Sequence, residues 1–580
     1  MTIVLPRPTH QCPPAVPCSC AAAPELGVLV DHRRVAPGPR TRLPRPPHAL
    51  RRHADLIIVG RLVTMDPARP EAEAIAVSDG RIVAVGDLAE VEGVRGPGTE
   101  VLELGDQVAY PGFVEPHMHL WASAMQDGWV DCSPLRLNGF DAIVSGLRDA
   151  GPTKQGWTLG AGFDPSLLPG EPALTRDILD AAIPDRPALV LNASLHFAYL
   201  NSRALEAAGL HEDEPDPAGG TFGRTAGRLD GSLGELPAMA RGLGVVPQMS
   251  HEELLDAIVA ATQRAARRGV TKVHEALTGA ILGAAEIDLV HSLSDRLATR
   301  VSYAISGAAH ERLLATGIEA GAGDDMVRAV SWKLVSDGSN QGRSGFQRED
   351  YLGSAHRGHA NYTVDELAAH VRLAHDRGWQ VMLHANGDAA IGLVLDAYEA
   401  GLRGASGLRH RDRIEHCSVP EEADLERMAR LGISPSFLMN HLYYWGRAFA
   451  ENIFGPEKAG RLGPVASAVR HGLRPSFHSD YTVTAIDPLR SVQTAVTRVV
   501  RDGDHVLNGH ERVPAQQAMR AVTIDAAWQI HADDVLGSLE VGKYADLVVL
   551  DADPCLLDPE AIADIGIART MLQGQVTFSA

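Results

Sequence analysis

Short apolar strands alternate with amphipathic helices through the middle of the chain, and no other sequence feature restricts the fold as strongly. Helical spacing over 364–378 is followed by a buried apolar run at 379–388 and by a second helical pattern over 389–402. The same order recurs as far as residue 480. Strands that alternate with helices form parallel sheets built from βα units. Because so many units follow one another, the sequence predicts a closed (β/α)8 barrel of the TIM type.

The two ends of the chain have a different pattern, in which short apolar runs are separated by turn residues. We expect residues 53–108 and 531–580 to form one small β-sandwich, with the barrel over 109–530 placed between them. The stretch from about 130 to 245 is rich in Pro and Gly and is interpreted as an insertion in the barrel that can cover a substrate. Residues 1–52 are rich in Pro and Arg and are expected to be a disordered extension.

Charge and composition argue against several classes of partner. The net charge of -20 disfavours nucleic acid and anionic membranes. The sequence contains no apolar run near the roughly 20 residues that a membrane helix needs. Six cysteines in 580 residues do not make a disulfide framework, so a reducing cytoplasm is expected. We therefore expect a soluble, cytoplasmic protein whose partner is a small molecule.

Polar side chains that can bind metal stand near the carboxyl ends of the predicted strands. They are His117, His119, Lys333, His384, His416 and Asp480. In a (β/α)8 barrel these ends share one mouth, and on a strand residues i and i+2 point to the same side. Burying so many polar groups together is costly unless a cation binds them. Imidazole and carboxylate suit zinc, and also manganese, iron or nickel, so the sequence predicts a divalent metal site with zinc as the expected ion.

Several motifs, taken together and in order, resemble the amidohydrolase superfamily. The branch that they match is often called amidohydrolase family 3 and includes N-substituted formamide deformylases. The motifs are "PGFVEPHMHL", "WKLVSDGS", "VMLHANGDAAI", "DRIEHC", "HSDYTV" and "GSLEVGKYADLVVLD". The resemblance covers residues from about 54 to 580. It implies a metal-dependent hydrolase that acts on C–N bonds outside peptides.

The same resemblance implies a site for one or two ions. His117 and His119 would bind the more buried ion, and His384 and His416 the more exposed one. Lys333 would be carboxylated on its amine and bridge the two ions. A neutral lysine amine can capture carbon dioxide, which turns a repelling cation into an anionic ligand. Metal ions lower the pKa of a bound water and so provide hydroxide near neutral pH.

Asp480 would touch the metal and act as the general base on that water. An alternative reading pairs Lys333 with Asp337 in an ordinary salt bridge, which would leave a site for one ion. Two positions depart from the family pattern. Glu115 stands where the family more often has Asp, and His478 stands where many members have Gly.

Four further residues are candidates for contact with the substrate: His196, His274, Arg343 and Trp445. Each also has a structural interpretation. The two histidines can be satisfied residues of the fold, the arginine can face solvent from a loop, and the tryptophan can pack a loop on neighbouring helices.

The predicted function is hydrolysis of an amide, an N-substituted formamide or a cyclic amide by metal-activated hydroxide. Two alternatives stay open. One is a deaminase or an esterase that uses the same site. The other is a catalytically silent barrel that serves as a binding or scaffold protein. The oligomeric state also stays open, and a homodimer agrees with the resemblance because relatives are often dimers or larger.

Overall fold

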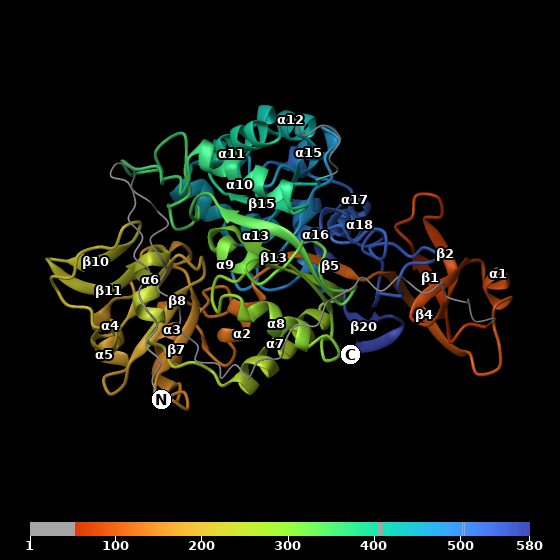
Figure 1. Cartoon of the computed structure of the whole chain (residues 1–580), viewed down its shortest axis with the longest axis horizontal. Coiled ribbons are helices and arrows are strands. Elements are labelled where there is room, and N and C mark those ends of the chain that lie inside the picture. The colour runs from red at the N-terminus through yellow and green to blue at the C-terminus, as the bar shows by residue number, and fades with distance from the viewer. Residues whose placement is uncertain (1–52, 404–409, 502, 504) are drawn as a thin grey trace.

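A closed parallel barrel forms the centre of the molecule (Figure 1). The computed structural model describes residues 53–403, 410–501, 503 and 505–580, so the extension expected over 1–52 lies outside the described residues. The strands follow the order β18-β17-β16-β15-β14-β13-β12-β5. They are β5 (Phe113–Met118), β12 (Val270–Thr278), β13 (Arg300–Ser306), β14 (Val327–Val335), β15 (Gln380–Ala385), β16 (Arg413–His416), β17 (Ser434–Phe437) and β18 (Ser476–Phe477).

The barrel closes where the chain after β18 meets the end of β5. The backbone N–H of Asp480 donates to the carbonyl of His117 at 3.2 Å, and the N–H of His119 donates to the carbonyl of Tyr481 at 2.7 Å. These two bonds complete the ring of strands. They also bring the two most distant segments of the predicted site together. The (β/α)8 prediction is confirmed.

Helices cover the outside of the barrel and strand side chains fill its inside, which explains why β15 and β16 are buried along their whole length. Capping boxes of Ser or Thr with Glu start α7, with Ser250 and Glu253, and α10, with Thr363 and Glu366. The helices between and after the barrel strands are α2 (Leu120–Met125), α7 (His251–Ala266), α8 (Ala285–Ser292), α9 (His310–Leu314), α10 (Val364–Asp376), α11 (Asp388–Gly401), α12 (Glu422–Leu431), α13 (Met439–Ala448), α14 (Pro456–Ala459), α15 (Val465–Arg470), α16 (Pro488–Thr497), α17 (Ala515–Ala521) and α18 (Ile524–Gln529).

The insertion between β5 and β12 is a folded layer with its own six-stranded sheet, in the order β10-β11-β9-β8-β7-β6. It has its own apolar clusters, one of which contains Leu189, Leu200 and Leu233. In Figure 1 it lies on the opposite side of the barrel from the sheet of the chain ends. Its elements are β6 (Val130–Asp131), α3 (Phe140–Asp149), β7 (Thr158–Phe163), α4 (Arg176–Ala182), β8 (Ala188–Asn192), β9 (Phe197–Leu200), α5 (Ser202–Ala207), β10 (Thr221–Thr225), β11 (Arg228–Gly234) and α6 (Glu235–Leu243).

The two chain ends build one β unit, as the sequence predicts. Hydrogen bonds join all seven strands into one sheet, in the order β21-β20-β19-β4-β1-β2-β3. A hairpin joins β2 to β3, and positive φ angles of 50° at Asp79 and 75° at Gly80 suit its two-residue turn. The elements are β1 (Leu56–Val63), β2 (Glu71–Ser78), β3 (Arg81–Gly86), α1 (Leu88–Glu92), β4 (Glu100–Pro111), β19 (Leu547–Leu550), β20 (Ile567–Leu572) and β21 (Gln575–Ser579).

Within residues 53–580, apart from the few positions not described, no helix combines the length and the apolar character needed to cross a bilayer.

Candidate metal centre

Three of the predicted metal ligands meet where β5 and β18 end. Oδ1 of Asp480 lies 3.3 Å from Nε2 of His117 and 3.1 Å from Nε2 of His119. One ligand atom from each of the three residues lies within 4.8 Å of the other two. Zinc bonds to nitrogen and oxygen are about 2.0–2.2 Å long, so donor atoms at these separations can share one ion.

The other three predicted ligands belong to the same cluster. The ring of His416 lies 5.1 Å from that of His117 and 4.5 Å from that of His384, measured between centroids. Nδ1 of His416 is 3.9 Å from Oδ2 of Asp480. Nζ of Lys333 lies 3.4 Å from Nε2 of His117. The structure thus gathers all six predicted ligands, from five different strands, at one mouth of the barrel.

Positive φ angles occur at the strand ends that present two of these ligands. His416, Cys417 and Asp480 have positive φ angles of 63°, 43° and 50°. Such angles cost about 1–3 kcal/mol each in residues other than Gly, and they cluster at functional sites. At β16 the turn is sharp enough that the N–H of Cys417 donates to the carbonyl of Glu415 at 2.8 Å. The backbone turns at these residues, so that the side chains of His416 and Asp480 lie at the mouth of the barrel and the strands do not continue beyond them.

Glu415 and Arg413 hold His117 from behind. Nδ1 of His117 donates to Oε2 of Glu415, and Arg413 donates to both carboxylate oxygens of Glu415 at 2.7 Å. Burial alone would raise the pKa of Glu415, but the charge of Arg413 and the contact with His117 hold it well below its usual range. The carboxylate fixes Nδ1 as the protonated nitrogen of His117, which leaves the lone pair of Nε2 free toward Asp480 and His119.

Asp337 supports His384 in a similar way and not Lys333. Its Oδ1 lies 3.0 Å from Nδ1 of His384. The carboxylate also accepts from the backbone N–H groups of Phe346, Asn386 and Gly387. Lys333 points instead toward His117, and burial lowers the pKa of its amine to about 8. This geometry disfavours the ordinary salt bridge between Lys333 and Asp337 that the sequence left open.

Several buried polar atoms in the cluster have no hydrogen-bond partner among the described residues. They include Nδ1 of His416, Oδ1 of Asp480 and both ring nitrogens of His478 and His441. The ring of His478, the residue that replaces the usual Gly, stacks on that of His117 at 4.6 Å. A buried polar atom without a partner costs about 1–3 kcal/mol. A divalent cation among these donors would remove much of this cost, so the residues fit a metal centre.

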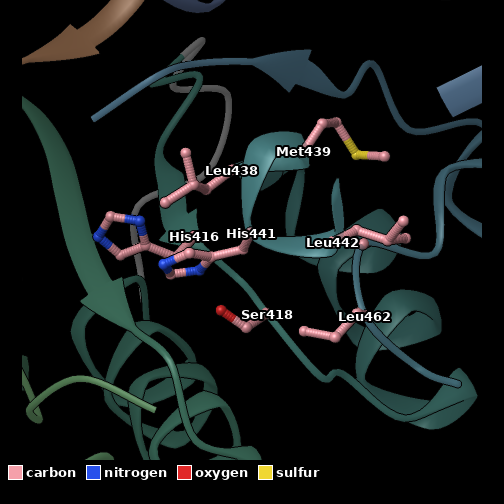
Figure 2. Close-up of a pocket in the computed structure, with 8 residues that line it drawn as sticks. His416, Ser418, Leu438, Met439, His441, Leu442 and Leu462 are labelled. Atoms are coloured by element: carbon pink, nitrogen blue, oxygen red, sulfur yellow. The ribbon is translucent and has the colours of Figure 1, made fainter. Parts of the chain in front are cut away.

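A small cavity adjoins the cluster on the side of β17 (Figure 2). His416, Ser418 and His441 provide its polar lining, and four apolar side chains complete it: Leu438, Met439, Leu442 and Leu462. The ring of His441 packs edge-on against Trp445 at 5.3 Å, and Nε1 of Trp445 donates to Asp164 at 3.0 Å. Trp445 is fully buried. The structure therefore places this predicted substrate contact behind His441, in a packing role.

The other three predicted substrate contacts have different surroundings. His274 lies inside the barrel, where its ring nitrogens contact Ser302 at 2.9 Å and Met382 at 3.2 Å. Arg343 donates to the backbone carbonyls of Leu352 and Asn452 and so ties two loops together. The surroundings of His274 agree with a structural role, whereas Arg343 is half-buried and bonded to backbone and does not simply face solvent. His196 instead pairs through Nδ1 with a carboxylate, that of Glu235, at 2.8 Å.

The sequence interpretation missed the supporting carboxylates Glu415, Asp337 and Glu235. Glu415 stands in "DRIEHC", immediately before a predicted ligand, and Asp337 was considered only as a partner of Lys333. The available signal was their type and position, since acidic residues in a predicted buried strand or at its end need a partner. The sequence alone does not say which histidine each would hold.

The sequence and the fold are both similar to those of known proteins. The model of the Amidohydrolase family matches residues 100–578. The N-substituted formamide deformylase of Arthrobacter pascens is 29% identical over 553 residues, which cover 90% of this chain and 98% of that protein. Protein LONG AFTER FAR-RED 3 of Arabidopsis thaliana is 30% identical over 517 residues, with coverage of 86% and 88%. The crystal structure of an uncharacterized metal-dependent hydrolase from Pyrococcus horikoshii OT3 aligns with a TM-score of 0.70 at 21% identity, covering 87% of this chain and 99% of that one.

Proposed function

Because this chain belongs to the amidohydrolase family, we propose that it is a metal-dependent hydrolase that cleaves a non-peptide C–N bond in a small molecule. The proposed substrates are amides, N-substituted formamides and cyclic amides. One observation carries the proposal: His117, His119 and Asp480 place donor atoms within 4.8 Å of one another at the mouth of the barrel. The similarity to an N-substituted formamide deformylase over 90% of the chain supports the choice of bond.

The proposed ligands divide between two ions. His117 and His119 would hold the first, and His384 and His416 the second, with Lys333 as a carbamate between them. Imidazole and carboxylate donors suit zinc, which is the proposed metal. When bound, the metal would polarise the carbonyl of the substrate and lower the pKa of a water molecule. The position of Nζ of Lys333, 3.4 Å from Nε2 of His117, supports a bridging role.

The residues of the chain provide the positioning and the proton transfer. A carboxylate oxygen of Asp480 takes a proton from water and passes it to the leaving nitrogen, since its contacts with His117 and His119 hold it at the reacting centre. Burial alone would raise the pKa of Asp480, but the neighbouring imidazoles hold it well below its usual range. The carboxylate is therefore ionised and able to accept a proton at neutral pH. The products would be an amine and a carboxylic acid.

Metal analysis and a substrate panel test this proposal together. Protein from metal-replete growth is analysed for bound metals and assayed on N-substituted formamides, amides and cyclic ureas, with an ester and an aminopurine for comparison. We expect bound zinc or a related divalent ion and hydrolysis of at least one C–N substrate. A double variant, His117→Ala with His119→Ala, should lose both the metal and the activity. A protein that binds no metal and cleaves none of the panel would contradict the proposal and favour the scaffold alternative.

A further inference from the structure

His196 and Glu235 form a pair that belongs to the insertion and not to the barrel. His196 precedes β9, and Glu235 begins α6. Two hydrogen bonds join them. The N–H of Glu235 donates to the carbonyl of His196 at 2.7 Å, and Nδ1 of His196 donates to Oε2 of Glu235 at 2.8 Å. A pair tied through both backbone and side chain has one defined geometry, which an ordinary surface ion pair does not have.

The backbone around this pair is strained. Glu235 has a φ of 64°, and Leu195, which precedes His196, has a φ of 60°. Positive φ is uncommon for residues other than Gly and is unusual for side chains of this size. Oε1 of Glu235 is also buried without a hydrogen-bond partner among the described residues. Strain and an unsatisfied oxygen at the same residue indicate that this position is held for the contact with His196 and not for local stability.

The pair lies beside the loop that follows β14, close enough to Asp337 and Asp480 for their charges to affect His196. Phe197, the residue after His196, packs on the loop that follows β14. A Cβ atom placed on Gly342 of that loop would lie 3.1 Å from the ring of Phe197, so the absence of a side chain permits the close approach. Burial raises the pKa of Glu235, but the contact with His196 first, and then the charge of His359 from the same loop, hold it below its usual value. The insertion therefore contacts the loop after β14 beside His196.

Charged groups of the candidate metal centre affect the pKa of His196. Burial lowers its pKa, but Glu235 first and then Asp337 and Asp480 outweigh burial and raise the pKa above the usual value. His196 in turn contributes to lowering the pKa of His384, after the larger effect of burial. The protonation state decides what the ring can do. With Nδ1–H donating to Glu235, a neutral ring offers only an acceptor at Nε2, whereas the protonated ring offers a donor there.

We propose that Glu235 is a positioning residue that holds His196 toward the barrel mouth, where Nε2–H of His196 donates a hydrogen bond to the carbonyl oxygen of the substrate. This inference rests on the proposed function and extends it, because it assigns the insertion a part in the reaction. The donor strengthens its bond as negative charge develops on that oxygen. The substrate class that it selects is a carbonyl compound with an accessible oxygen, as in formamides and simple amides.

The variants Glu235→Gln, His196→Phe and His196→Gln test the pair. The assays use 4-nitroformanilide and 4-nitroacetanilide across a range of pH, with metal content measured on each sample. His196→Phe should lower kcat by about 10²-fold, the usual effect of losing one such donor, with the metal retained. His196→Gln should recover part of the rate, because its amide is also a donor.

Glu235→Gln keeps an oxygen acceptor for Nδ1 but removes the negative charge. The protonated ring is the active form, so activity falls as the pH rises through the pKa of His196. Removing the charge lowers that pKa, and the basic limb of the kcat/KM profile should move to lower pH. The control is Glu214→Gln, another carboxylate of the insertion, which pairs with Arg241 of α6 at 2.8 Å. Its profile should match the wild type. A wild-type profile in Glu235→Gln would overturn the proposal.

A measurement that does not need turnover separates this proposal from the proposed function. The ring Cε1–H resonance of His196, identified by its loss in His196→Phe, is titrated by NMR in the wild type and in Glu235→Gln. We expect a lower pKa in the variant and a shift of the resonance when N-methylformamide is added to the wild type. If the wild type cleaves no probe, the proposed function fails, but these two results still decide the role of the pair. An unchanged pKa or no shift with N-methylformamide would overturn it.

Discussion

Asp480 shows most directly how single residues build the proposed reaction. Asp480 follows β18, the last strand of the barrel, and its positive φ turns its carboxylate toward His117 and His119. The same residue also helps to close the barrel, since its backbone N–H donates to the carbonyl of His117. Asp480 therefore both helps to close the barrel and provides the proposed general base.

The change Asp480→Asn tests the proton path. We expect kcat to fall by about 10²-fold or more, the usual effect of losing a general base, because an amide cannot accept the proton from water. The fold should persist, since Asn can keep the backbone bond and nearly the same volume, and circular dichroism will check this. Asp396→Asn, which removes a surface carboxylate paired with Arg427 at 2.6 Å, is the matched control. Near-normal turnover in Asp480→Asn would show that another group carries the proton.

Lys333→Ala tests the proposed carbamate. Loss of the bridging ligand should lower the metal content, and a short carboxylic acid added with zinc should restore part of the activity by taking the place of the carbamate. Lys272→Ala is a stringent control, because Lys272 is also buried and burial also lowers its pKa, to about 7. Any activity lost in Lys272→Ala should not be restored by the added acid. Full metal content in Lys333→Ala, with no effect of the acid, would contradict a bridging role.

At the scale of elements, β16 carries the residues that orient one proposed ligand and also provides another proposed ligand itself. Arg413 and Glu415 point to one side and hold His117, while His416 ends the strand and enters the site. A strand of four residues therefore serves both proposed metal positions. The supporting carboxylate should matter nearly as much as a ligand, because it fixes the tautomer and orientation of His117.

Glu415→Gln tests this support. The amide can present one oxygen to Nδ1–H of His117, but it lacks the charge that pairs with Arg413, so we expect a loss of about 10–100-fold in metal affinity or activity. Competition with a chelator measures the affinity. The control is Glu286→Gln, which alters another buried carboxylate that binds only backbone N–H groups near α8. Equal zinc affinity in Glu415→Gln and the wild type would show that His117 is oriented without Glu415.

The barrel elements could be predicted because their signals are local. Each strand from β14 to β17 is a buried apolar run between two helical patterns. In three of these strands a polar residue near the carboxyl end indicates where the mouth of the barrel lies. The insertion was harder to interpret. Its strands β10 and β11 form a hairpin around Ala226 and Gly227, with φ angles of 53° and 82°, but the surrounding glycines resemble a plain loop.

The support of the site could not be predicted for a different reason. His196 and Glu235 are 39 positions apart, and His117 and Glu415 are 298 apart. No periodicity or spacing connects such residues, and only the folded chain brings each histidine to its carboxylate. One sequence therefore indicates which residues can bind metal, whereas the partners that orient them follow from the tertiary structure.

At the scale of the whole molecule, the site and the joint to the sheet of the chain ends lie at opposite ends of the barrel. The ligands stand at the carboxyl ends of the strands. Arg300, at the amino end of β13, pairs with Asp546 just before β19, at 2.6 Å, and both side chains are only 1% exposed. Asp546 also accepts from the N–H of Gln573, and its carbonyl accepts from Gly112. In barrels of this kind the amino end serves stability and the carboxyl end serves chemistry.

Asp546→Ala should therefore destabilise the molecule without altering the metal site. The variant leaves Arg300 buried without its anion, and removal of one partner from a buried ion pair costs about 3–5 kcal/mol. Thermal and urea denaturation will measure the loss, and metal content per folded chain should stay at the wild-type value. The double variant Arg300→Met with Asp546→Leu removes both charges, and it should recover much of the stability because no unpaired charge remains. If Asp546→Ala is as stable as the wild type, the pair does not join the terminal sheet to the barrel. If it loses metal while still folded, the two ends of the barrel are coupled, contrary to the division of roles that the geometry indicates.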